Sequence, residues 1–201
     1  MEKTEGKYLK HNLIERVLHW IYVSAVVLLI LSGLQIHFAG FDIFGPMNNA
    51  RYVHFIAMYF FIFTVVAEAY QFFALGTYKV SMFRPEDING LIPMMKYYLL
   101  ATSKEPEFEK YNPLQKIAYG VVTSLMTFIV IITGLTLYWP VTFVFVAKFF
   151  GGLGYVRLFH YLFSWFYIVF LMIHVYLVFS EDVRKSFVPM ITGYAPKEEK
   201  H

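Results

Sequence analysis

Long apolar runs, separated by short polar segments, follow one another along the chain. Four of these runs exceed 20 residues, at about 13–38, 52–75, 114–138 and 156–180. A helix needs about 20 residues to cross a hydrocarbon core of about 30 Å, so each run is long enough to span a membrane. The pattern predicts an all-α fold, an integral-membrane four-helix bundle that forms one domain over residues 1–201.

Two shorter apolar stretches lie between the predicted spans. Over about 86–100, apolar residues recur at helical spacing, which predicts an amphipathic helix along the membrane surface. Residues 141–150 are interrupted by Lys148, which favours an interfacial connector. The first span is longer than the 7–15 apolar residues of a signal peptide, so we expect it to be retained.

The composition agrees with a membrane protein. Of the 201 residues, 58% are hydrophobic, which is more apolar surface than a soluble domain of this size can bury. The chain has no cysteine, which excludes disulfides, zinc–thiolate sites and thiolate-bound iron–sulfur clusters.

Lysine and arginine set the expected orientation. One side of the predicted bundle carries Lys3, Lys7, Lys10, Arg16, Lys79, Arg84, Lys96, Lys104, Lys110, Lys116, Arg184, Lys185, Lys197 and Lys200. The other side carries only Arg51, Lys148 and Arg157. Loops rich in lysine and arginine usually stay on the cytoplasmic side of a membrane, so this asymmetry predicts that both termini are cytoplasmic.

Four of the seven histidines fall inside the predicted spans: His19, His54, His160 and His174. Ionisable groups at membrane depth are costly and are usually functional. A single intramembrane histidine is often a hydrogen-bonded packing residue, but that explanation is poor for four in one small bundle. His11, His37 and His201 lie at polar ends, and we assign them no ligand role.

The orientation sorts these four histidines into two pairs at two depths. His19 lies early in the first span and His174 lies late in the fourth, so both lie toward the cytoplasm. His54 and His160 lie early in the second and fourth spans, so both lie toward the outside. His160 and His174 are 14 residues apart, about 21 Å along a helix and nearly on one face.

Paired imidazoles favour iron in a planar macrocycle, clamped from opposite sides. A zinc site would need three or four ligands at one depth, which this pattern does not supply. An arginine precedes His19, His54 and His160 by three residues, as Arg16, Arg51 and Arg157. Each lies one helical turn closer to water, where it can bind a haem propionate or serve as an interfacial anchor.

The chain resembles the b-type cytochrome subunits of membrane-bound nickel–iron hydrogenases over nearly its whole length. The matching segments are Arg16-Val-Leu-His19-Trp20, Ser32-Gly33, Arg51-Tyr-Val-His54, Tyr111-Asn112-Pro113-Leu114-Gln115, Ile132-Thr133-Gly134-Leu135, His160, Ile173-His174-Val175-Tyr176, Glu181-Asp182 and Met190-Ile-Thr-Gly193-Tyr194. The cytochrome subunits of formate dehydrogenases and thiosulfate reductases share the histidines, while residues 181–194 look more like the hydrogenase branch.

This resemblance implies two b haems stacked across a bacterial or archaeal cytoplasmic (inner) membrane, with His54/His160 and His19/His174 as their axial ligands. It implies that an iron–sulfur small subunit, with its nickel–iron large subunit, docks on the outer face and delivers electrons. These electrons would cross to menaquinone or ubiquinone near the cytoplasmic surface. The chain would then be an electron-transfer subunit without a hydrogen-activating site. We expect no nucleic-acid partner, and leave a higher-order oligomer open.

Residues for quinone and proton handling follow from this expectation. Asn112 and Gln115, at the cytoplasmic entrance of the third span, are candidates for the quinone site. Asn112 fits equally well as a helix N-cap ahead of Pro113. Glu68 lies within the second span, where an acid needs a partner or a proton, so it is a candidate proton carrier.

Other functions remain open at this point. A formate dehydrogenase or thiosulfate/polysulfide reductase cytochrome would have the same electron-transfer path through two haems to a quinone, with another catalytic partner. A proton-relay transporter would be colourless and would need a continuous polar path. A passive membrane anchor would show no reaction with quinone.

Overall fold

The computed structural model describes residues 6–38, 40–99, 101–103, 106, 108, 111–180 and 182–196. Some residues used in the sequence argument lie outside this set: Lys3, Lys104, Lys110, Glu181, Lys197, Lys200 and His201. The chain forms two compact units, one of residues 1–70 with 168–201 and one of residues 71–167. Both boundaries fall inside long helices.

Three of the described helices are long and apolar enough to cross a membrane: α1 (Leu13–His37), α2 (Met47–Ala74) and α8 (Leu153–Ser180). They match the first, second and fourth predicted spans. α2 begins five residues before the predicted start at 52, and α8 begins three residues before 156. Many of their large apolar side chains are exposed, as expected for helices that face lipid.

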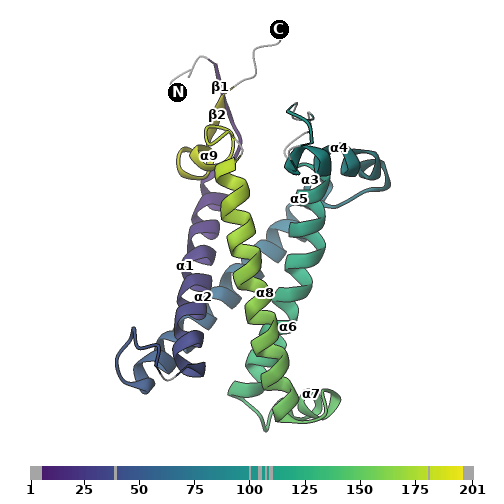
Figure 1. Cartoon of the computed structure of the whole chain (residues 1–201). Coiled ribbons are helices and arrows are strands. Elements are labelled where there is room, and N and C mark those ends of the chain that lie inside the picture. The colour runs from purple at the N-terminus through teal and green to yellow at the C-terminus, as the bar shows by residue number, and fades with distance from the viewer. Residues whose placement is uncertain are drawn as a thin grey trace. The chain divides into compact units, whose positions relative to one another are not determined.

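In the first unit, α1 and α2 form an antiparallel hairpin (Figure 1). The buried side chain of Gln35 organises the connection between them. Its Nε2 donates to Asp42 Oδ1 at 3.1 Å and to the Gly45 carbonyl at 2.7 Å, and its Oε1 accepts from the backbone N–H groups of Ile43 and Phe44. One glutamine therefore satisfies much of the polar backbone of this turn.

The two ends of the chain meet in the first unit. β1 (Lys7–Leu9) pairs antiparallel with β2 (Tyr194–Pro196), directly after the short helix α9 (Phe187–Thr192) (Figure 1). Gly193 ends α9 with a left-handed φ of 90°, and its carbonyl accepts from Lys10 and His11. A Cβ at Gly193 would lie 3.0 Å from the His11 carbonyl oxygen, so this turn requires glycine.

The second unit contains α3 (Tyr78–Ser81), the 3-10 turn η1 (Pro85–Asp87), α4 (Ile88–Tyr98) and α7 (Val144–Phe149). α4 is the predicted amphipathic helix, and the side chains of Ile88, Ile92 and Met95 are exposed along it. The predicted connector at 141–150 contains α7. Neither α3 nor the two strands were predicted.

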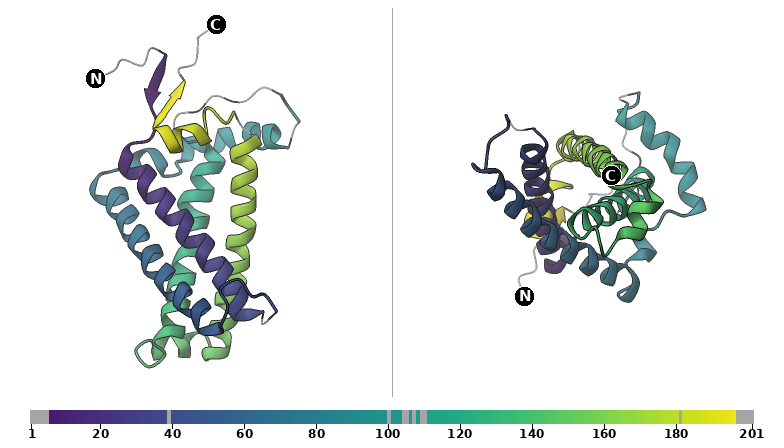
Figure 2. Two further views of the ribbon diagram at one scale, coloured as in Figure 1. Left: turned by 90° about the vertical axis from the view of Figure 1, so that its left-hand side faces the viewer. Right: turned by 90° about the horizontal axis from the view of Figure 1, so that it is seen from below.

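The predicted span at 114–138 is a continuous helical path (Figure 2). Its first half departs from a regular α-helix. It consists of α5 (Pro113–Lys116), the π-helical segment η2 (Ile117–Thr123) and α6 (Ser124–Tyr138). Within η2, the Thr123 hydroxyl donates to the Ala118 carbonyl, five residues earlier, at 2.7 Å. π-helical segments are rare and occur often at functional sites.

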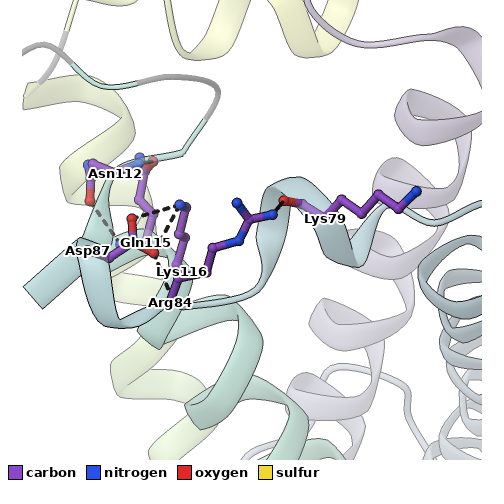
Figure 3. Close-up of polar contacts among 6 residues, drawn as sticks. All are labelled: Lys79, Arg84, Asp87, Asn112, Gln115 and Lys116. Carbon is purple, nitrogen blue, oxygen red and sulfur yellow. Dashed lines mark hydrogen bonds and ion pairs between the residues drawn. The ribbon is translucent and has the colours of Figure 1, made fainter.

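A polar cluster fixes the start of this path against η1 (Figure 3). Lys116 Nζ lies 2.8 and 3.1 Å from the two carboxylate oxygens of Asp87, and Asp87 Oδ2 also accepts from the Arg84 backbone N–H at 2.8 Å. Partial burial raises the pKa of Asp87, but the hydrogen bonds and charges of Lys116 and Arg84 outweigh it and hold that pKa below its ordinary value.

We predict that Asp87→Asn reduces the free energy of unfolding at neutral pH by about 1 kcal/mol. The thermal unfolding midpoint of the detergent-solubilised protein should fall accordingly. Because the pKa of Asp87 is lower in the folded state, its carboxylate stabilises the folded protein at pH values above the unfolded-state pKa of about 3.9. This stabilisation is lost as the pH falls through the folded-state pKa. The difference from the wild type should therefore vanish in strong acid. Glu86→Gln, at an exposed neighbour, is the control and should change nothing. An equal effect of both variants would contradict this account.

Candidate functional site

His19 and His174 lie close together in the first unit. His19 is in the second turn of α1 and His174 is in the last two turns of α8. Their ring centres are 6.4 Å apart, with 54° between the ring planes, and both side chains are half-buried. The proximity expected from the sequence is therefore found.

This spacing fits the ligation of one metal ion by both rings. Two imidazoles that each place a nitrogen about 2 Å from one metal have ring centres roughly 6 Å apart, since each ring centre lies behind its nitrogen. Direct hydrogen bonding between the rings would bring them closer. The residues present thus fit a bis-imidazole haem site.

Aromatic side chains border this histidine pair. Trp20 meets His19 edge-on at 5.5 Å between ring centres, and Phe170 stacks on His174 at 6.0 Å and 13°. The indole of Trp20 also packs edge-on against Phe187 of α9 and donates from Nε1 to the Met190 carbonyl at 3.0 Å. The helix α9 is thereby attached to the turn of α1 that carries His19.

Arg16 lies one turn before His19, as the sequence indicates. Its Nη1 donates to the carbonyl of Ile191 in α9. Its Nε is buried and makes no hydrogen bond to any of the described residues. Buried guanidinium N–H groups of this kind need an acceptor, so Arg16 has hydrogen-bonding capacity for an anionic ligand group.

His54 is held by α1 within the same unit. The Ser32 hydroxyl, which is fully buried, lies 2.9 Å from His54 Nδ1. The next residue, Gly33, faces the same ring, and a Cβ placed there would lie 3.5 Å from His54 Cε1. His54 is in the second turn of α2, so its ring lies beside the last turns of α1.

His160 has a matching hydroxyl and glycine beside it in the second unit. The Thr133 hydroxyl, also fully buried, lies 3.0 Å from His160 Nδ1. Gly134 follows it, and a Cβ there would lie 3.2 Å from His160 Cε1. A hydroxyl–glycine pair late in one helix thus holds a histidine early in the next long helix, once in each unit.

The remaining candidates are exposed or already have structural roles. Arg51 and Arg157 are exposed one turn before His54 and His160, and Glu68 is exposed on α2. Asn112 and Gln115 form a reciprocal cap (Figure 3), in which Asn112 Oδ1 accepts from the Gln115 N–H at 2.9 Å and Gln115 Oε1 accepts from the Asn112 N–H at 3.1 Å. Asn112 Nδ2 also donates to Tyr98 at 2.9 Å.

The family comparison agrees with this arrangement. A family model described as prokaryotic cytochrome b561 matches residues 10–193. The chain belongs to this family. Members are b-type cytochromes, so the chain is a multi-pass membrane protein that binds haem b and takes part in electron transport. The family resemblance seen in the sequence is confirmed.

Known proteins of similar sequence carry related names. A Cupriavidus necator protein, 26% identical over 202 residues, is named probable Ni/Fe-hydrogenase B-type cytochrome subunit; the match covers 89% of this chain and 83% of that protein. A Methanosarcina mazei protein, 24% identical, is named F420 non-reducing hydrogenase II cytochrome subunit, with 83% and 74% covered. An Azospira oryzae protein, 27% identical, is named putative protein-methionine-sulfoxide reductase subunit YedZ1, with 89% and 93% covered.

Sequence reasoning missed several contacts of the site. The Ser32 and Thr133 hydroxyls and the carbonyls of α9 received no role beyond marking the family. A Ser-Gly or Thr-Gly pair late in a span, followed in the next span by Arg-x-x-His, is the signal that would have pointed to the hydroxyls. The partners of Arg16 and Trp20 are backbone carbonyls, which no side-chain pattern reports.

We predict different effects of Gly33→Ala and Gly134→Ala on haem content. At Gly33 the new methyl group would make an ordinary contact, and alanine favours a helix by up to about 1 kcal/mol, so haem per chain should be retained. At Gly134 the 3.2 Å approach forces His160 to shift, so haem per chain should fall. The pyridine haemochrome spectrum of each purified variant measures this ratio, and equal haem loss in both variants would contradict the geometry.

Proposed function

We propose that this chain is the di-haem cytochrome b subunit of an uptake hydrogenase and conducts electrons across the membrane from an iron–sulfur subunit to a quinone. The observation that carries the proposal is the His19–His174 pair, at a spacing that suits two axial ligands of one haem. The repeated seating of His54 and His160 adds a second pair of equivalent imidazoles.

In this proposal His19 and His174 hold one haem b, and His54 and His160 hold the other. Haem b supplies one-electron chemistry when bound. Arg16, Arg51 and Arg157 each lie one turn before a ligand and bind the propionates through charge-assisted hydrogen bonds. The buried Nε of Arg16 supports this role for Arg16, and the exposure of Arg51 and Arg157 leaves their guanidinium groups accessible to a carboxylate.

The proposed arrangement has four membrane spans in one cytochrome domain, residues 1–201, with both termini cytoplasmic. The path from Pro113 to Tyr138 serves as the third span, and 26 helical residues suffice for it. The charge asymmetry of the loops supports the orientation. The membrane is then the bacterial or archaeal cytoplasmic membrane, with α4 on its inner surface.

The proposed partners are the small iron–sulfur and large nickel–iron subunits of a hydrogenase, docked on the outer face. The names of the Cupriavidus and Methanosarcina relatives support this choice. The Azospira relative is named for a different reductase, and a formate dehydrogenase or thiosulfate/polysulfide reductase partner would use the same wiring. Co-purification of this chain from its native membrane identifies the catalytic subunit directly.

Menaquinone or ubiquinone is the proposed electron acceptor, bound near Asn112 and Gln115. The two side-chain amides differ in how many of their atoms already make hydrogen bonds. Asn112 uses both its oxygen and its nitrogen, whereas the cap uses only the oxygen of Gln115. Gln115 Nε2 is therefore the proposed donor to a quinone carbonyl, and Glu68 is the proposed proton carrier.

We predict that Gln115→Glu slows re-oxidation of the reduced haems by a soluble quinone analogue about tenfold, the cost of one lost hydrogen bond. Glutamate retains the capping oxygen, so the fold and the haem spectrum should be unchanged. The decay of the reduced-haem absorption band after quinone addition to liposomes measures the rate at pH 7.

The control is Asn89→Asp, the same amide-to-carboxylate change at an exposed residue of α4, and it should retain the wild-type rate. A wild-type rate in Gln115→Glu would remove Gln115 from the quinone site. A wild-type chain whose reduced haems do not react with quinone would contradict quinone reduction and favour a passive anchor. A colourless chain would favour a proton relay.

A further inference from the structure

We infer that Ser32 and Thr133 are positioning residues that hold His54 and His160 with the proton on Nδ1 and the lone pair on Nε2, the nitrogen that faces iron. This inference rests on the proposed function for the role of the two histidines as ligands. It adds the groups that fix the tautomer of each ring and tune its strength as a donor.

The hydrogen bonds of Ser32 decide the direction of its contact with His54. Its Oγ lies 2.5 Å from the Leu28 carbonyl oxygen, and only a hydroxyl proton directed at that oxygen makes this distance favourable. A hydroxyl has one proton to donate. The serine oxygen is therefore the acceptor toward His54 Nδ1, 2.9 Å away, and the imidazole donates.

Thr133 repeats this arrangement in the second unit. Its Oγ1 donates to the Ile129 carbonyl at 2.6 Å and so accepts from His160 Nδ1 at 3.0 Å. The backbone carbonyl of Val130 is a second acceptor for the His160 ring, which also requires a ring N–H on this side. Both hydroxyls are completely buried, and each bonds to the carbonyl four residues earlier in its own helix. Because Ser32 and His54 lie in one unit and Thr133 and His160 in the other, the same contact forms twice.

The glycines complete the seat of each ring. Cε1 lies between the two ring nitrogens, and Gly33 and Gly134 offer no side chain on that side. With Nδ1 bonded to the hydroxyl and Cε1 against the glycine, the ring cannot turn over without losing its hydrogen bond. The ligating nitrogen is thereby oriented before iron binds.

A hydrogen bond accepted from Nδ1–H increases the basicity of the ligand nitrogen at the other side of the ring. A more basic axial ligand favours the oxidised, more positively charged iron and lowers the midpoint potential of that haem. The histidines that Ser32 and Thr133 contact are His54 and His160. If these two histidines hold one haem, as proposed, the hydroxyl contacts change the midpoint potential of that haem.

The test is a potentiometric titration of the purified holo-protein with Ser32→Ala and Thr133→Val. Each variant should raise the midpoint potential of one and the same haem, leave the other haem unchanged, and add its shift to that of the other in the double variant. Ser32→Thr and Thr133→Ser restore an accepting oxygen and should restore the wild-type potential. If Ser32→Ala or Thr133→Val loses one haem instead, and Ser32→Thr or Thr133→Ser retains both haems, that result also supports the inference.

Thr136→Val is the matched control, because Thr136 is equally buried on α6 and donates to the Ile132 carbonyl at 2.7 Å. It should leave both potentials unchanged. The inference is overturned if two bound haems keep their wild-type potentials in Ser32→Ala and Thr133→Val, or if Thr136→Val produces the same shift. In both cases the proposed function stands, whereas a wild-type chain without haem would overturn both.

Discussion

Within a membrane, water is not available to complete the hydrogen bonds of polar groups, so each must find its partner inside the protein. An imidazole that ligates a metal through one nitrogen still carries an N–H on the other. In the proposed haem site, Ser32 and Thr133 supply an acceptor for this N–H at His54 and His160 without adding a charge. Burying each hydroxyl costs little free energy, because its proton is donated to a backbone carbonyl of its own helix.

The same constraint explains the polar residues elsewhere in the chain. Gln35 satisfies the backbone of the connection between α1 and α2, which lies beside the helix end that carries Ser32. Asn112 and Gln115 satisfy the first N–H groups of the path that leads to Thr133. At the His19 end, Arg16 and Trp20 satisfy the last carbonyls of α9. Polar side chains thus set where each helix begins, ends or attaches.

The sequence predicts the long helices well because apolar length alone decides them, and the error at the start of α2 has a clear cause. Asn48 and Asn49 look like loop residues but lie in the first turn of that helix. The π-helical segment η2 was not predicted, because its register depends on packing rather than on composition. The strands β1 and β2 were missed because each has three residues and forms only when the chain ends meet.

Some features of the candidate site could likewise be predicted from the sequence, and others could not. The proximity of His19 and His174 follows from orientation and spacing, and the N-cap role of Asn112 follows from the proline after it. The hydroxyl contacts of His54 and His160 depend on how neighbouring helices are rotated, which no single-sequence pattern specifies. The pairing of His54 with His160, the ligand roles of all four histidines and the quinone site remain predictions.

Every proposed role of this chain depends on the binding of two b haems by its four intramembrane histidines. The most direct measurement is haem stoichiometry by pyridine haemochrome assay of the purified wild type and of single His→Ala variants, with His37→Ala as the control at the end of α1. We expect two haems per chain in the wild type and in His37→Ala. We expect one haem per chain after substitution of His19, His54, His160 or His174. A wild-type chain with one haem or none, or a ligand variant that keeps both, would contradict it.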